Sequence, residues 1–342
     1  MGMIGATVHK ATVAIDEFFP HGVRGLSHES YCCRVHDQPE SPTSRPAPNG
    51  GNCQNSVEII DWFRHNARDL PWRHPGTTAW GILVSEVMSQ QTPVARVAPR
   101  WEEWIQRWPE PADLAAASTD EVLRAWGKLG YPRRALRLKE AAVAIVSLHD
   151  GQVPATVDHL LSLPGIGDYT ARAVAAFAFD AAVPVVDVNV RRVLRRHRQG
   201  VFLPGTHKSA DLVAVDSLLP ARDAAEFSAG VMELGATVCI ARTPRCSECP
   251  VESTCEWVQL GRPAPEESEL AAAKRRVQKF EGTDRQVRGK LLDVLRAAHS
   301  PVEQSLLDAV WDDDVQRSRA LDSLLTDGLA EQDERGLFHL PR

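Results

Sequence analysis

Apolar residues recur along most of this chain at the three- and four-residue spacing of amphipathic helices. The pattern runs from Val57 to Cys255, with short breaks that contain Pro or Gly. In its first half it predicts helices over residues 57–66, 80–91, 94–107, 119–129 and 133–148. Helix follows helix in this way, so the sequence predicts an all-α core.

The two ends of the chain differ from this core. Residues 1–52 lack the pattern, and Pro, Ser, Asn and Gly crowd together near their end, which favours a poorly structured N-terminal extension. A start codon assigned too early would equally explain this stretch. After a core over residues 53–260, a charged, Pro-containing linker is expected over residues 261–283. Residues 284–342 then predict a winged-helix-like C-terminal unit, with helices over 285–298, 303–311 and 315–329 and a hairpin over 330–340.

Composition and charge narrow the class of protein only slightly. The 342 residues are 43% hydrophobic and 25% charged, as in ordinary soluble proteins, and the net charge of −6 gives no overall attraction to nucleic acid. Any such binding must come from local basic patches. The longest apolar run, residues 173–190, is interrupted by Asp180, Pro184 and Asp187, so no membrane span or export signal is expected. The odd total of seven cysteines suggests no disulfide framework, which favours a reducing compartment such as the cytoplasm.

Four of the cysteines form a compact motif. Cys239, Cys246, Cys249 and Cys255 follow the spacing C-x6-C-x2-C-x5-C, which suits a short loop wrapped around a 4Fe-4S iron-sulfur cluster. The alternative is zinc, but zinc sites usually combine two close cysteine pairs, and only Cys246 and Cys249 form such a pair. The spacing therefore favours the cluster.

A second motif, Leu-Pro-Gly-Ile-Gly over residues 163–167, lies between two helical patterns. Asp168 is expected to cap a helix that begins at Tyr169, which makes the segment a helix-hairpin-helix. Gly165 and Gly167 would let backbone amides approach a DNA phosphate without reading the base sequence. The alternative is an ordinary tight turn, but the cysteine motif downstream favours the DNA-binding interpretation.

The order of these features resembles the iron-sulfur DNA glycosylase superfamily. More narrowly, Ser-Glu-Val-Met-Ser-Gln-Gln-Thr over residues 85–92, Gly130-Tyr131, and Val-Asp-Val-Asn-Val over residues 186–190 resemble the adenine-specific mismatch glycosylases of the MutY type. The resemblance covers residues 57–257. It implies a two-lobed helix-hairpin-helix fold and a repair enzyme that flips and hydrolyses adenine mispaired with 8-oxoguanine or guanine in double-stranded DNA, leaving an abasic site.

The resemblance also assigns catalytic residues. Cleavage of an N-glycosidic bond needs an acid for the departing base and a carboxylate for the cationic sugar. By resemblance Glu86 protonates adenine at N7, Asp187 stabilises the sugar, and Asn189 orients that side of the pocket. Taken alone, Glu86 would be interpreted as a solvent-facing helix carboxylate and Asp187 as a helix cap.

Other residues are expected to contact DNA or the flipped base. The resemblance implies that Gln91, the second of the pair Gln90-Gln91, and Tyr131 enter the base stack, and that Trp72 and Arg73 line the base pocket. Tyr169 stands where bifunctional relatives carry a lysine nucleophile, which implies a monofunctional enzyme. Phosphate contacts are expected from some members of a basic group, and a solvated charged face is the alternative for such a run. The group comprises Arg191, Arg192, Arg195, Arg196, Arg198, Arg242 and Arg245.

The chain departs from the resembled family in two places. The tail is too short for the nucleotide pyrophosphohydrolase-like domain that reads 8-oxoguanine in many members. Ala229 stands where relatives carry Glu or Gln near adenine, and Ser89 replaces a larger apolar residue, so base selectivity is open to change. A thymine or broader mismatch glycosylase of the same fold, and a non-catalytic iron-sulfur DNA sensor, are the alternatives. We expect a monomer, and the richness in Ala and Arg indicates a bacterium.

Overall fold

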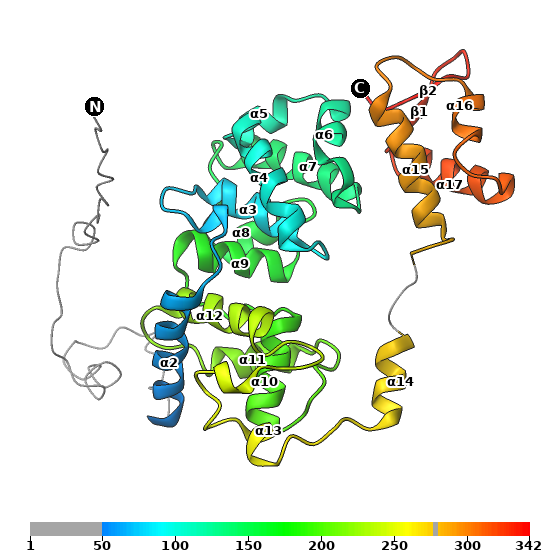
Figure 1. The fold of residues 1–342 in the computed structure, drawn as a ribbon. Helices are drawn as coiled ribbons and strands as arrows, with labels where there is room; N and C mark the ends of the chain where they lie inside the picture. The colour runs from blue at the N-terminus through cyan, green and yellow to red at the C-terminus, as the bar shows by residue number, and fades with distance from the viewer. Residues whose placement is uncertain (1–49, 276–279) are drawn as a thin grey trace, which may run out of the picture. The chain divides into compact units, whose positions relative to one another are not determined.

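The computed structural model describes residues 50–275 and 280–342, and in these ranges the chain is helical apart from one two-stranded sheet (Figure 1). The N-terminal extension predicted over residues 1–52 lies outside the described residues up to residue 49. The helix that follows it, α2 (Gly50–Asn66), begins earlier than the sequence predicts. Its apolar pattern starts only at Val57, so the first turns left no signal in the periodicity.

A first lobe is built around α3 (Ala79–Ser89), whose buried face includes Trp80, Leu83 and Val84. Thr78 begins this helix by accepting a hydrogen bond from the Gly81 amide. The helix packs against three others of the lobe. The remaining helices of the lobe are α4 (Val94–Arg107), α5 (Pro111–Ala116), α6 (Thr119–Trp126), α7 (Arg133–Leu148), α8 (Val157–Leu161) and α9 (Asp168–Phe179), with the 3-10 turns η1 (Pro71–Arg73) and η2 (Gly127–Leu129).

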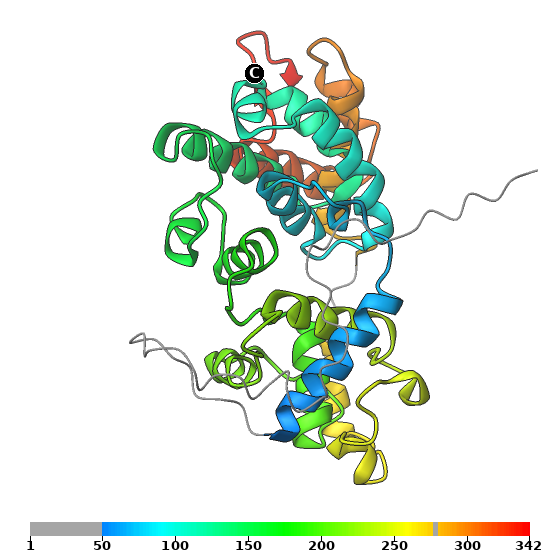
Figure 2. The same ribbon diagram turned by 90° about the vertical axis from the view of Figure 1, so that its left-hand side faces the viewer.

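A second lobe forms around α12 (Ala224–Thr237), which packs against α2 and against α10 (Val188–Gln199). Figure 2 shows α2 lying alongside the helices of this lobe. Gly235 brings α12 and α10 close, because a Cβ at this position would lie 2.8 Å from the Cβ of Asn189. The lobe also contains α11 (Ser209–Asp216), the 3-10 turn η3 (Cys246–Glu248) and α13 (Glu256–Gln259).

The C-terminal unit has the elements that the sequence predicts: the first helix begins and ends one residue earlier than predicted, and the others are shorter than predicted. They are α15 (Asp284–Ala297), α16 (Gln304–Asp308), α17 (Asp314–Thr326), β1 (Glu331–Gln332) and β2 (Phe338–His339). The strands pair antiparallel, and Val302 adds an isolated bridge to Phe338, which produces a small wing after the helices.

The C-terminal unit docks on the first lobe. Arg124 of α6 donates hydrogen bonds to the main-chain oxygens of Arg296 and Ala298, and Arg296 donates in return to the Leu123 oxygen at 2.9 Å. Each arginine thereby satisfies carbonyls that the end of the other helix leaves without partners. Leu291 and Leu295 belong to the same apolar core as the first lobe.

Three local predictions need correction. The linker contains a helix, α14 (Glu267–Arg275), because acidic residues in its first turn and a run of alanines favour helix more strongly than the flanking prolines oppose it. Asp168 does not cap α9; it is the first helical residue and pairs with Arg172 at 2.9 Å, while Gly167 is the N-cap. The predicted helix over residues 119–129 breaks at Gly127, whose φ is +53°. Among the described helices, none combines the length and apolar composition needed to cross a bilayer.

Candidate active site and cysteine loop

Glu86 projects from α3 into a group of half-buried polar side chains. The pKa of its carboxyl is raised to about 7, mainly by burial. The charge of Asp187 adds to the rise, whereas a hydrogen bond with Tyr169 and the charge of Arg73 oppose it. Part of the side chain still has access to solvent. The structure therefore brings together four residues that the sequence predicts for one site, and it leaves Glu86 able to hold or release a proton near neutral pH.

Asp187 lies at the N-terminus of α10 and is its cap. One carboxylate oxygen accepts from the Val190 amide and the other from the Asn189 side chain, both at 2.7 Å. Burial raises the pKa of this carboxyl, while these hydrogen bonds oppose the rise. The capping role does not exclude a catalytic one, because the same hydrogen bonds hold the carboxylate in one orientation.

Asn189 connects Asp187 to a buried arginine. Arg192 donates to the Asn189 side-chain oxygen at 2.7 Å, to the Gly235 oxygen at 2.5 Å and to the Cys239 oxygen at 2.7 Å. A chain of hydrogen bonds thus extends from the Asp187 carboxylate to the backbone of the first motif cysteine.

Arg192 also corrects a sequence prediction. Arg192 and Arg196 are only 5% and 1% exposed, so neither belongs to a DNA-facing basic group. Their four-residue spacing places both on the inner face of α10, where main-chain oxygens accept their hydrogen bonds.

Tyr169 lies in the first turn of α9, beside Glu86. Burial raises the pKa of its phenol well above the usual value, and the nearby carboxyls raise it further, so it stays neutral. A neutral phenol can donate to Glu86 but cannot replace a lysine amine as a nucleophile.

Arg73 owes its position to Glu233, a residue that the sequence analysis did not single out. Arg73 donates to one Glu233 oxygen at 2.9 Å, and Arg68 donates to the other at 2.6 Å. Burial alone would raise the pKa of Glu233, but the arginines lower it. A glutamate within the apolar pattern of α12 was the available signal, since a fully buried carboxylate needs such partners. Trp72 packs edge-on against Trp101, with ring centroids 6.0 Å apart.

The two residues predicted to enter the base stack share an unusual backbone conformation. Gln91 has φ +53° and Tyr131 has φ +47°, a region that residues other than Gly seldom adopt, and both side chains are exposed. Such conformations are concentrated at binding sites, where surrounding contacts must maintain them.

Arg134 supplies those contacts. Its guanidinium donates to the main-chain oxygens of Val87 and Gln90, both at 2.7 Å, and to the Gly130 oxygen at 3.1 Å. Burial lowers its pKa to about 10. Arg134 is the second residue of α7, at the helix end next to the loops that carry Gln91 and Tyr131.

The helix-hairpin-helix lies next to these loops. Gly165 has φ +76°, and Gly167 caps α9 without a side-chain hydrogen bond. The first amides of α9 therefore have no side-chain acceptor within the described part of the chain, as an anion site requires. Gln90 donates to Thr170 at 3.1 Å and so ties the end of α3 to α9.

The four motif cysteines line one pocket in the second lobe, together with Arg196 and Trp257. Within the described residues, no three His, Cys, Asp or Glu side chains are grouped to hold a single metal ion. Four thiols that line one pocket are the soft donor set that an iron-sulfur cluster requires. Burial raises the pKa of Cys249 to about 12, so its thiolate needs positive charge close by. Two arginines of this loop, Arg242 and Arg245, are exposed, and Arg245 pairs with Glu248 at 3.4 Å.

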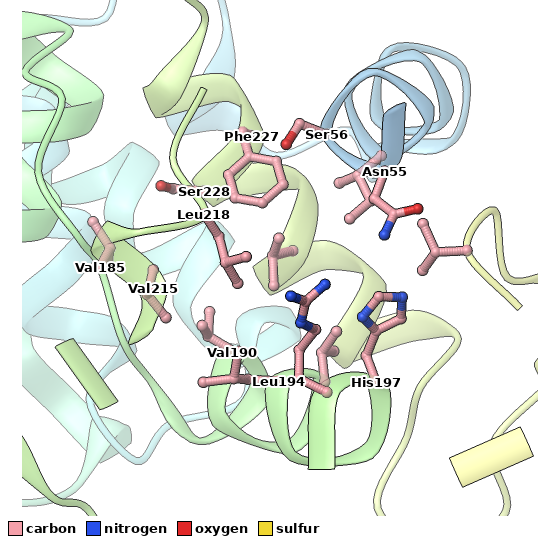
Figure 3. A pocket seen from close by; sticks show the side chains of 15 residues that line it. Asn55, Ser56, Val185, Val190, Leu194, His197, Val215, Leu218, Phe227 and Ser228 are labelled. Atoms are coloured by element: carbon pink, nitrogen blue, oxygen red, sulfur yellow. The ribbon is translucent and has the colours of Figure 1, made fainter. Parts of the chain in front are cut away.

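A separate apolar cavity occupies the interior of the second lobe (Figure 3). Val190, Leu194 and His197 of α10 line it with Phe227 of α12, and none of the predicted catalytic side chains does. The cavity is therefore distinct from the predicted catalytic site.

Comparison with known proteins identifies the class. The family model for HhH-GPD superfamily base excision DNA repair proteins matches residues 84–205. The structure of a thermostable thymine-DNA glycosylase superposes with a TM-score of 0.57 at 26% identity, over 61% of this chain and 97% of that one. An endonuclease III–DNA covalent intermediate superposes with a TM-score of 0.52 at 22% identity, over 61% and 96%, and supports the fold alone. The fold and site thus define a helix-hairpin-helix DNA glycosylase, which confirms the predicted all-α fold.

Two curated relatives specify the family. The adenine DNA glycosylase of Mycolicibacterium smegmatis is 58% identical over 286 residues, 83% of this chain and 95% of the relative. That of Mycobacterium tuberculosis (strain H37Rv) is 51% identical over 299 residues, 86% and 96% of the two chains. The chain belongs to the adenine DNA glycosylase family, as its motifs predict.

Proposed function

We propose that this protein hydrolyses the N-glycosidic bond of adenine mispaired with 8-oxoguanine or guanine in duplex DNA. The observation that carries the proposal is the grouping of Glu86 with Asp187 and Tyr169, in which the Glu86 pKa is raised to about 7. A carboxyl with that pKa is half protonated at neutral pH and suits a general acid. Family membership supplies the base, adenine, through the relatives' names.

In the proposed mechanism Glu86 donates its proton to N7 of the flipped adenine as the glycosidic bond breaks. Asp187, held by Val190 and Asn189, supports the positive charge that develops on the sugar. Glu86, now ionised, accepts a proton from the attacking water. Because Tyr169 offers no amine, the product is an abasic site and the strand stays intact.

The proposal assigns contacts with the base stack, with the phosphates and with the flipped base to different residues. Gln91 and Tyr131 fill the space left by the extruded base, and their loops, each with one residue at positive φ, are held by Arg134. Gln90 lies beside Gln91 and contributes to the same DNA-binding site. Phosphates are held at Gly165 and Gly167 and by the exposed arginines Arg242 and Arg245. Trp72 and Arg73 line the base pocket.

The cysteine pocket is proposed to hold a 4Fe-4S cluster on Cys239, Cys246, Cys249 and Cys255. When bound, such a cluster would tie the loop together and need not exchange electrons, since hydrolysis requires none. We also propose that the chain is divided into a core over residues 53–260, a linker over 261–283 and a C-terminal unit. The protein is proposed to act as a monomer in a bacterial cytoplasm.

The test uses purified protein and a duplex with adenine opposite 8-oxoguanine. We expect strand cleavage at adenine only after alkali treatment, and its loss in Glu86→Gln. Cleavage without alkali would contradict the monofunctional assignment. No adenine removal would contradict the proposal and direct attention to thymine mismatches; cellular function retained in full by Glu86→Gln would favour the DNA sensor.

A further inference from the structure

Tyr131 of the first lobe is in direct contact with the C-terminal unit. Arg285, at the start of α15, donates a hydrogen bond to the Tyr131 hydroxyl at 2.8 Å, and its guanidinium lies 4.7 Å from the centre of the Tyr131 ring. These residues are 154 positions apart in the sequence. The residue expected to enter the base stack is therefore held in part by a unit outside the glycosylase core.

The contact belongs to a longer series in which arginines alternate with aromatic rings. Arg134 lies 5.1 Å from the Trp126 ring centre and 5.5 Å from that of Tyr131, and Arg285 lies 5.3 Å from that of Phe280. Trp126 is fully buried and anchors the series, whereas Tyr131 is 38% and Phe280 52% exposed. Exposed aromatic rings with guanidinium groups between them are suited to stacking nucleobases.

Ion pairs connect the C-terminal unit to the first lobe on both sides of the Tyr131 loop. Lys128 pairs with Asp293 at 3.5 Å before the loop, and Arg133 pairs with Asp327 at 3.2 Å after it. Such exposed pairs add little energy. Together with the shared apolar core, they define where α15 meets the loop.

We propose that Arg285 is a positioning residue for opposite-base recognition, and that the C-terminal unit thereby contributes to reading the base opposite the extruded adenine. The inference rests on the proposed function, because it assumes that Tyr131 stacks beside that base. Arg285 restricts the Tyr131 ring before DNA binds, which reduces the conformational entropy that stacking would cost. Phe280 extends the stacking surface on the same side.

The experiment compares single-turnover rates of adenine removal from two duplexes, one with 8-oxoguanine opposite adenine and one with a tetrahydrofuran abasic analogue there. The ratio of the two rates measures recognition of the opposite base. We expect Arg285→Gln to reduce this ratio about two- to five-fold, the factor for an exposed cation–π contact. The rate opposite the abasic analogue should change little, since no base is present for Tyr131 to contact.

Two further variants keep the comparison decisive. Phe280→Ala should also reduce the ratio. It replaces Arg285→Gln as the test if Arg285→Gln melts at a lower temperature than the wild type. Arg335→Gln is the matched control, because it removes a guanidinium from the same unit, in the β1–β2 turn, where its partner is Asp333.

An unchanged ratio in Arg285→Gln would overturn the inference, whether both rates stay the same or both fall by the same factor. The proposed removal of adenine would still stand. Absence of adenine removal by the wild type would instead overturn the proposed function and this inference with it.

Discussion

The guanidinium of Arg134 donates a hydrogen bond to the main-chain oxygen of Gln90 at 2.7 Å. The same side chain reaches the Gly130 oxygen, so one residue joins the two loops expected to enter DNA. Both loops contain a residue at positive φ, and their conformations depend on this connection.

Replacement of this arginine tests the connection. Arg134→Lys keeps the charge but cannot serve several carbonyls at once, so we expect duplex affinity to fall about ten-fold and stability to fall by about 1–3 kcal/mol. Fluorescence anisotropy and denaturant unfolding would measure the two effects. Arg107→Gln is the control, because Arg107 forms an exposed pair with Glu121 and should change either quantity little. Equal behaviour of the two variants would refute the role of Arg134.

The pH dependence of catalysis should report the proton on Glu86. Because the acid form is required, kcat/KM should decrease as pH rises through about 7, the pKa of this carboxyl. Single-turnover rates between pH 5.5 and 9, with enzyme in excess of the DNA but below saturation, would define this limb. A rate that stays constant over the whole range would exclude Glu86 as the acid.

The raised pKa of Glu86 also has a cost in stability. The folded protein binds this proton more tightly than the unfolded chain does. The protonated carboxyl therefore contributes its full share of the free energy of unfolding below pH about 4.5, and this contribution is lost as pH rises through about 7. Glu86→Gln carries no such penalty. Relative to the wild type, the variant should gain about 1–3 kcal/mol between pH 5 and pH 8, with partial solvent access reducing the effect. Urea unfolding of both proteins at both pH values gives this difference, which would be zero if Glu86 were a solvated carboxylate.

Replacing Tyr169 provides a second test of the proton on Glu86. Its hydrogen bond lowers the pKa of Glu86, so Tyr169→Phe should move the alkaline limb of the rate profile to higher pH. The magnitude of the rate at low pH should be affected less than the position of the limb. A shift to lower pH would mean that the phenol does not stabilise the ionised carboxylate.

Metal analysis separates the two interpretations of the cysteine motif. We expect about four iron atoms and about four sulfide ions per chain, with broad visible absorbance, from protein purified without oxygen. Cys249→Ser should lose the absorbance, whereas Ser247→Ala, in the same turn, should keep it. One zinc ion per chain would favour the alternative.

Several elements of the fold were predictable because their causes are local. The apolar pattern and the flanking Pro and Gly residues gave the bounds of α4 and α7 as the structure has them. Helical hydrogen bonds connect residues four positions apart, so a short stretch of sequence contains most of the information. The motifs were likewise sufficient for the family, because their residue types and spacing are specific.

Other features depended on contacts that no short stretch contains. Arg192 and Arg196 were expected on a DNA-facing surface but lie buried beneath the cysteine loop. Glu233 was overlooked because its partners, Arg68 and Arg73, are more than 150 residues away in the sequence.

The sequence by itself determined the helical elements, the cysteine loop and the presence of Glu86 and Asp187 in recognisable motifs. Only the tertiary structure decided that Glu86 has a pKa near neutrality and that Arg285 meets Tyr131. The physical reason is that proton affinity depends on burial and on charges brought together by folding. The position of Arg285 depends on how the C-terminal unit docks, and local periodicity contains no information about that interface.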